Sequence, residues 1–207
     1  MRLHSRVEDG EELPALVWSP GPGMRMISSA VLGGGIGERA WILNAQVAHG
    51  YRRIDPQRHL ADLAHRFGAE GEGVGLLTAA DVRAYGRGGD RGVEAVVTAG
   101  LGVRGWAASH ADSEPAPKPG TINIVVALPV ALTDAALVNA VATATEAKVQ
   151  ALVEAGYDCS GTPTDAVCVA ARTPVEGADV HAFAGPRSPW GARLARAVHA
   201  AVLAAIP

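Results

Sequence analysis

Short apolar segments separated by turn residues dominate the first half of the chain. Runs of about four to eight apolar residues bounded by glycine, proline or serine are typical of β-strands. We therefore expect strands at residues 13–18, 24–30, 40–47, 74–78 and 93–100. The glycine-rich stretches 33–37 and 87–92 predict loops. Residues 107–119 are polar and rich in proline, which predicts a surface loop or a lid.

Three other segments carry the pattern of helices. A proline in the first turn supports a helix at 56–67, with Asp55 as its N-cap. A long helix is expected from Asp134, its N-cap, to about Gly156, because glycine commonly ends a helix. The last helix is expected at 189–205.

The order of these elements predicts the fold class. Residues 121–128 form an almost continuous apolar run, typical of a strand buried on both faces, and 165–171 predict a further strand. Strands that come early and helices that come late favour an α+β fold over a regular alternation. We expect a mixed β-sheet sandwich with a long buried helix and a C-terminal helix packed on it. The length suits one domain spanning residues 1–207.

Composition narrows the class of protein. The chain is 48% hydrophobic and 19% charged, a profile that excludes disorder and a coiled coil. A net charge of −3 offers no basic surface for nucleic acid. No apolar run is long enough to span a membrane, and the acidic N-terminal stretch does not resemble a signal peptide. Two cysteines cannot form a disulfide framework, so we expect a reduced, cytoplasmic protein.

Cofactor motifs are not found. A dinucleotide-binding loop needs glycine at its first, third and sixth positions, and counting from Gly33 the sixth residue is Glu38. The chain has no phosphate-binding loop with Gly-Lys-Ser/Thr, and its histidines are scattered. We therefore expect neither a bound cofactor nor a metal.

One lysine stands out on the long expected helix. A helical projection places Lys148 in an apolar stripe with Val138 and Leu152, with Thr145 inside the stripe and Glu146 at its edge. A lysine among core residues is costly unless it is paired or lines a cavity, which makes it a candidate for proton transfer. The alternative is a lysine whose ammonium reaches past the helix edge into solvent.

Three segments rich in short hydroxyl side chains adjoin apolar strands. They are Ser28-Ser29 before the glycine-rich stretch, Gly120-Thr121-Ile122-Asn123, and Ser160-Gly161-Thr162-Pro163-Thr164-Asp165. Each alone is typical of a turn. Brought together on one rim, their hydroxyl and backbone N–H groups would suit the binding of amides or of an oxyanion.

In chain order, these and other segments resemble the adenosylcobinamide amidohydrolase family. The resemblance runs from about residue 24 to residue 202, and its blocks are Ser28-Ser29-Ala30, Asn44 with Val47, 74–80, 97–101, Gly120-Thr121-Ile122-Asn123-Ile124, Thr145-Glu146-Ala147-Lys148, 160–166 and 184–191. The chain departs from the family's pattern at Pro163, where a glycine is expected, and at Phe183-Ala184-Gly185-Pro186.

The resemblance implies hydrolysis of one amide in corrinoid salvage. Adenosylcobinamide would be split into adenosylcobyric acid and 1-aminopropan-2-ol, so the corrinoid is the substrate and not a cofactor. The implied partner is this small molecule, without nucleic acid or membrane. The sequence leaves both a monomer and a homodimer open.

Amide hydrolysis needs a nucleophile, an oxyanion site and a proton for the leaving amine. Our hypothesis is that Lys148, oriented by Glu146, moves the proton. Thr121 or Thr164 is the nucleophile or anchors a water, and direct attack by water is equally open. We expect Asn123 and glycine N–H groups to bind the oxyanion, and Asp165 to position a catalytic partner. The residues expected to bind the substrate are Ser28, Ser29, Gly34, Gly35, Asn44, Thr98, Gly120, Thr145, Gly161 and Thr162.

Two other functions fit parts of the sequence. A self-processing amidase or acyltransferase with an N-terminal nucleophile would be cleaved before Thr121, which follows the expected surface loop. A non-catalytic corrinoid-binding module is the other alternative. The Asp-x-His-x-x-Gly signature of the common corrinoid-binding domain is absent from the sequence, and such a module would have no need for a buried lysine.

Overall fold

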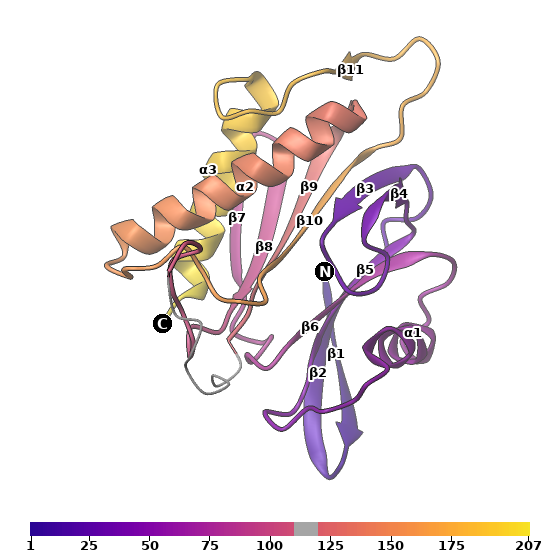
Figure 1. Ribbon diagram of the computed structural model, residues 1–207. Coiled ribbons are helices and arrows are strands. Elements are labelled where there is room, and N and C mark those ends of the chain that lie inside the picture. Colours follow the sequence, from indigo (N-terminus) through magenta and orange to yellow (C-terminus); the bar gives the residue numbers. More distant parts are fainter. Residues whose placement is uncertain (110–119) are drawn as a thin grey trace.

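Two mixed β-sheets and three α-helices make up the part of the chain that the computed structural model describes, residues 1–109 and 120–207 (Figure 1). The first sheet has the strand order β1 (Arg2–Glu8), β2 (Glu11–Trp18), β5 (Trp41–Gln46) and β6 (Gly73–Thr78). The second has the order β4 (Gly35–Glu38), β3 (Met24–Ser28), β10 (Ala166–Arg172), β9 (Ile122–Leu132), β8 (Val93–Ala99) and β7 (Gly86–Asp90), and β11 (Val180–His181) also pairs with β9. The pairs β5–β6, β9–β10 and β9–β11 are parallel, and the others are antiparallel.

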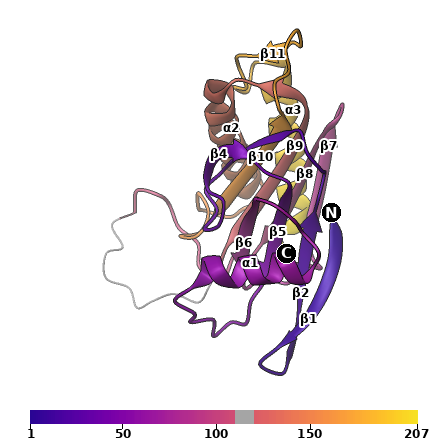
Figure 2. The same cartoon turned by 90° about the vertical axis from the view of Figure 1, so that its right-hand side faces the viewer.

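Helices cover the outer faces of both sheets. Helix α1 (Pro56–Arg66) packs on the first sheet, whereas α2 (Asp134–Glu154) and α3 (Pro189–Ala205) pack on the second. Figures 1 and 2 show α1 at the opposite end of the molecule from α2 and α3. The apolar residues predicted to be strands and helices therefore form the α+β sandwich expected from the sequence, including the C-terminal helix packed on a sheet.

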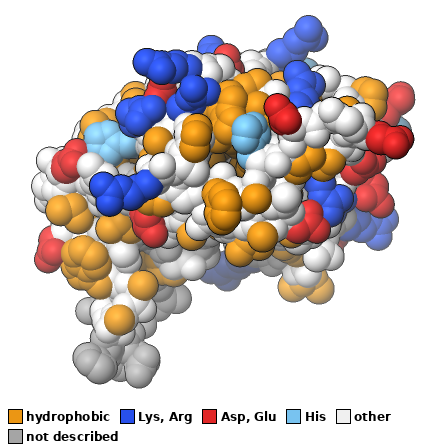
Figure 3. Space-filling view, turned by 90° about the horizontal axis from the view of Figure 1, so that it is seen from above, with side chains coloured by type: hydrophobic (Ala, Val, Ile, Leu, Met, Phe, Trp, Pro, Cys, Tyr) orange, Lys and Arg blue, Asp and Glu red, His pale blue; other side chains and the backbone are white. Residues whose placement is uncertain are grey.

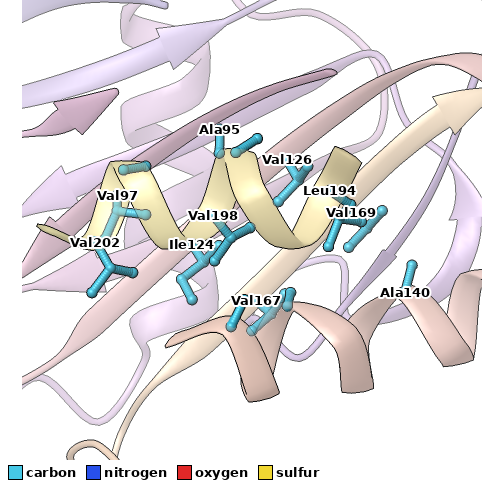
Figure 4. Packing of buried hydrophobic residues seen from close by; sticks show 14 of the residues in the cluster. Ala95, Val97, Ile124, Val126, Ala140, Val167, Val169, Leu194, Val198 and Val202 are labelled. Carbon is cyan, nitrogen blue, oxygen red and sulfur yellow. The ribbon is translucent and has the colours of Figure 1, made fainter. Parts of the chain in front are cut away.

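Three clusters of buried side chains hold these layers together. The largest lies between the second sheet and the helices α2 and α3, and it contains Ile124 and Val169 of the sheet with Ala140 of α2 and Val198 of α3 (Figure 4). A second cluster joins the first sheet to α1. The third lies between the sheets and contains Met26, Val125 and Cys168 of the second with Ile42 and Leu76 of the first.

Strand β7 corrects one expectation, because it lies in the glycine-rich stretch 87–92 that predicted a loop. A Cβ atom added at Gly86 or Gly88 would collide with the carbonyl oxygens of Ala201 or Ala197 on α3. The glycines therefore serve the close approach of a helix to this strand. The loop predicted at 33–37 is corrected as well, because β4 begins at Gly35 and pairs with β3. Strands β1 and β11 were also not expected.

The helix termini differ in detail from the prediction. The hydroxyl of Thr133, and not Asp134, caps α2 by accepting a hydrogen bond from Ala136 N. Asp55 occupies the N-cap position of α1, but its carboxylate makes no capping bond and pairs with Arg53 instead. Val138, expected in the apolar stripe, is 57% exposed, so the buried face of α2 is rotated from the one predicted. Of the expected loop 107–119, residues 110–119 lie outside the described residues.

Candidate active site

Asp165, which directly precedes β10, is the centre of a dense hydrogen-bond cluster. Its Oδ1 accepts from the Ile122 backbone N–H at 2.9 Å and from the Thr162 hydroxyl at 2.5 Å. Its Oδ2 accepts from Lys148 Nζ at 2.5 Å and from the Thr162 backbone N–H at 3.2 Å. A carboxylate offers about four acceptor sites, and these four donors use all of them. The parallel pairing of β9 and β10 brings residues 120–123 and 160–165 together.

Lys148 reaches this cluster from α2. The residue is only 6% exposed, which confirms the buried lysine predicted from the helical pattern. Its partner is Asp165 and not Glu146, whose side chain is on the exposed face of α2. Residues two apart on a helix point in different directions, so Glu146 cannot orient Lys148 in the way the sequence suggested. The counter-ion of Lys148 therefore comes from the segment before β10 and not from α2.

Gly161 lies directly against this ion pair. Its φ of +146° is a conformation that L side chains rarely adopt, and an added Cβ would collide with Asp165 Oδ2 and lie 2.5 Å from Lys148 Nζ. The carbonyl of Gly161 also accepts from Gly105 N at 3.0 Å. Glycine is therefore required here for both backbone conformation and space.

Two threonines form a hydroxyl chain beside Asp165. The oxygen atoms of Thr121 and Thr164 are 2.6 Å apart, and the Thr164 hydroxyl donates to the Gly120 carbonyl at 3.0 Å. Because the single proton of Thr164 is used in that way, the Thr121 hydroxyl donates to Thr164. Within residues 1–109 and 120–207, no carboxylate, imidazole or amine hydrogen-bonds to either oxygen. The arrangement orients the hydroxyls but gives them no adjacent base.

Asn123 belongs to a second polar network, between the two sheets. Its amide nitrogen donates to Asn44 Oδ1 at 2.9 Å and to the Leu77 carbonyl at 3.0 Å, while Asn44 Nδ2 donates to the Thr98 hydroxyl at 2.9 Å. A backbone carbonyl only accepts, so Leu77 fixes the orientation of the Asn123 amide. Both N–H groups are therefore committed, which argues against the expected role of Asn123 as an oxyanion donor.

Two cavities flank Asp165. The larger, about 550 Å³, opens on the α2 side and is lined by Lys148, Thr145, Gly161 and Thr162 together with residues of the 103–109 segment. The smaller, about 420 Å³, is lined by Ser29, Asn123 and Thr164 and by apolar side chains of both sheets. Asp165 borders both cavities. Asp165 therefore lies between two possible ligand sites.

The other expected residues divide between the cluster and its surroundings. Ser29 lines the smaller cavity, whereas the Ser28 hydroxyl is buried and bonded to Val167 O and Ala30 N. Thr145 lines the larger cavity, and its hydroxyl donates to its own helix at Val141 O. Gly34 and Gly35 line neither cavity; Gly34 instead packs against the Ala30 carbonyl.

Sequence reasoning missed one wall of the larger cavity. Trp106 is 45% exposed, and its indole N–H donates to Asp158 at 3.0 Å. Arg104 also lines this cavity, and its Cζ lies 5.4 Å from the centroid of the Tyr157 ring. The sequence favoured a core position for Trp106, with stacking against the corrinoid as the alternative, and its exposure corrects the first of these.

Among the described residues there is no group of three His, Cys, Asp or Glu side chains that could hold a metal ion. No helix in the described ranges is long and apolar enough to cross a membrane. On the face shown in Figure 3, acidic and basic side chains are both present with apolar side chains between them.

Comparisons with known proteins give a consistent result. The model of the adenosylcobinamide amidohydrolase family matches residues 2–207. An adenosylcobinamide amidohydrolase of Methanosarcina mazei is 38% identical over 145 residues, which are 70% of this chain and 68% of that protein. One of Halobacterium salinarum is 43% identical over 96 residues, 46% of this chain and 39% of that protein.

A solved structure resembles the fold alone. The crystal structure of a protein from Pyrococcus horikoshii has a TM-score of 0.50 at 12% sequence identity. The match covers 94% of this chain and 76% of that one.

Proposed function

Since the chain belongs to the adenosylcobinamide amidohydrolase family, we propose that it hydrolyses the aminopropanol amide of adenosylcobinamide at the cluster around Lys148 and Asp165. The products are adenosylcobyric acid and 1-aminopropan-2-ol, and the corrinoid is the substrate. The observation that carries the location is the buried ion pair, whose carboxylate borders two cavities. Paired acidic and basic side chains that line a cavity are candidates for proton transfer to a bound ligand.

The ion pair can supply both the oxyanion site and the proton. Lys148 has three N–H donors, of which one binds Asp165, so the ammonium retains donors for the amide carbonyl oxygen in the larger cavity. Those donors would stabilise the negative charge that develops on this oxygen in the tetrahedral intermediate. This assigns to Lys148 the role that Asn123 cannot fill.

The nucleophile in this proposal is water. A threonine needs an adjacent base, and none contacts Thr121 or Thr164 within the described ranges. Water adds to the carbonyl carbon and gives up a proton to the Asp165 carboxylate, which releases one of its four hydrogen bonds to accept it, because the Lys148 ammonium has no lone pair. The pair returns a proton to the amine nitrogen as the C–N bond breaks. Thr164, which lines the smaller cavity, can accept a hydrogen bond from the attacking water.

The larger cavity would face the corrinoid. Its buried end holds Lys148, and its exposed rim holds Trp106 and Arg104. A corrin macrocycle is too large to enter a cavity of about 550 Å³ entirely, whereas its amide-bearing arm can reach the ion pair. The exposed indole, fixed by Asp158, offers the macrocycle an apolar contact.

Purified protein incubated with adenosylcobinamide tests this function directly. Mass spectrometry should detect adenosylcobyric acid and free aminopropanol, with and without a chelator. The same spectra should show an intact chain, because cleavage before Thr121 would favour the self-processing alternative. Tight binding without product would instead favour a corrinoid-binding module.

A further inference from the structure

The smaller cavity contains a buried acceptor without a donor. Asn123 is only 1% exposed and lines this cavity, and its Oδ1 has no hydrogen-bond partner among the described residues. Its orientation is fixed, because its N–H groups bind Asn44 and the Leu77 carbonyl. A buried acceptor of this kind favours a ligand that donates a hydrogen bond to it.

Ser29, which lines the same cavity, provides a hydrogen-bond donor without an acceptor in the part of the chain that the structure describes. The Ser29 oxygen accepts from Val167 N at 3.1 Å, and its hydroxyl proton has no acceptor in residues 1–109 and 120–207. Asn123 and Ala166 are paired neighbours on β9 and β10, and Ser29 follows β3 on the other side of β10. The cavity thus offers one acceptor and one donor, from segments on either side of β10.

Apart from Thr164 and Asp165 on the side of the ion pair, the rest of the wall is apolar. Ala30, Val31, Pro56, Leu76 and Ala166 line the cavity around these two polar groups. The combination suits a small group that carries one hydroxyl and one methyl. At about 420 Å³ the cavity has ample room for the amino-alcohol end of the substrate.

We infer that the smaller cavity binds the amino-alcohol end of the substrate and selects for its hydroxyl group. The hydroxyl donates to Asn123 Oδ1 and accepts from the Ser29 hydroxyl, while the methyl group packs on Ala30 and Leu76. This inference rests on the proposed function, because it places the leaving amine beside Asp165, which also borders this cavity. The carbonyl oxygen then faces Lys148 in the other cavity.

The test compares two amides of the same corrinoid. One carries 1-aminopropan-2-ol, and the other carries propylamine, which lacks only the hydroxyl. We expect the hydroxyl to raise kcat/KM at least about 10-fold, because a site that hydrogen-bonds a substrate hydroxyl discriminates strongly against its absence. Ser29→Ala should remove most of this preference.

Ser28→Ala is the matched control, since the Ser28 hydroxyl is bonded within the chain, and it should keep the preference. Equal rates for both amides in the wild type, or an unchanged preference in Ser29→Ala, would overturn the inference while leaving the hydrolase function standing. If neither amide is hydrolysed, the proposed function fails. In that case calorimetry measures the affinities of the wild type and of Ser29→Ala for both amides. Equal affinities in the wild type, or an unchanged affinity ratio in Ser29→Ala, would overturn the inference.

Discussion

At the scale of single residues, the site depends on a charge pair that is buried and closely surrounded. Lys148 and Asp165 come from different elements, and their side chains are 8% and 13% exposed. Removing one partner of such a pair leaves the other charge buried, whereas removing both charges is often neutral. Stability and catalysis can therefore be separated by comparing single and double substitutions.

We predict that Lys148→Met abolishes turnover and lowers the free energy of unfolding by ~3–5 kcal/mol, because the Asp165 carboxylate then remains buried without its cation. The double variant Lys148→Met with Asp165→Asn should recover much of that stability without recovering activity. Denaturant unfolding and product formation measure the two effects. Activity in the double variant would exclude the pair from the reaction.

Gly161 allows a sharper test of the geometry. Gly161→Ala should reduce activity by about 100-fold or more, since the new Cβ must displace the ion pair. Gly156→Ala is the matched control: Gly156 also has a positive φ, +85°, but an added Cβ meets nothing within 4 Å. We expect it to cost ~1 kcal/mol of stability and no activity. Similar activity losses in both variants would show that backbone strain, and not contact with the pair, is responsible.

At the scale of elements, periodicity predicted helices and apolar strands well. The long helix and the strand Ile122–Leu132 were both expected near their observed positions, because their apolar positions are numerous and consecutive. Strand β7 was not, since its sequence Gly-Arg-Gly-Gly-Asp has none of the side chains that favour strands. Its conformation depends on pairing with β8, the next strand, and on close packing against α3, which is distant in sequence. Local patterns cannot contain that information.

The packing of α3 on β7 predicts a specific sensitivity. Gly88→Ala should destabilise the protein by ~1–3 kcal/mol, because the Cβ would collide with the Ala197 carbonyl and overpack this interface. Gly89→Ala, at the next position, meets only Val93 O at 3.3 Å and should cost less. Melting temperatures of the two variants provide the comparison. A larger loss for Gly89→Ala would contradict this account of the interface.

At the scale of the whole molecule, the candidate site is assembled from both sheets and from α2. The sequence identified Lys148, Asp165, Thr162 and Asn123 as individual candidates, partly through a family resemblance. It could not predict which of them pair, because Lys148 and Asp165 lie 17 residues apart on different elements. It also could not predict that Asn44 and Thr98 join Asn123 in a network that crosses between the sheets. Such contacts depend on how the layers stack.

The interior between the sheets contains a thiol that reports on this stacking. Burial raises the pKa of Cys168 to about 12, so the folded chain keeps this proton at pH values where an unfolded chain loses it. Above the ordinary thiol pKa of about 8.5, the unfolded state binds fewer protons, and the free energy of unfolding must fall as the pH rises toward 12. In a Cys159→Ala background, where Cys168 is the remaining thiol, we expect this alkaline decline in denaturant unfolding and very slow alkylation at pH 8. Replacing Cys168 with alanine as well should flatten the decline. Fast alkylation of the folded chain would show instead that the two sheets separate readily, and that the smaller cavity, which both sheets line, opens with that motion.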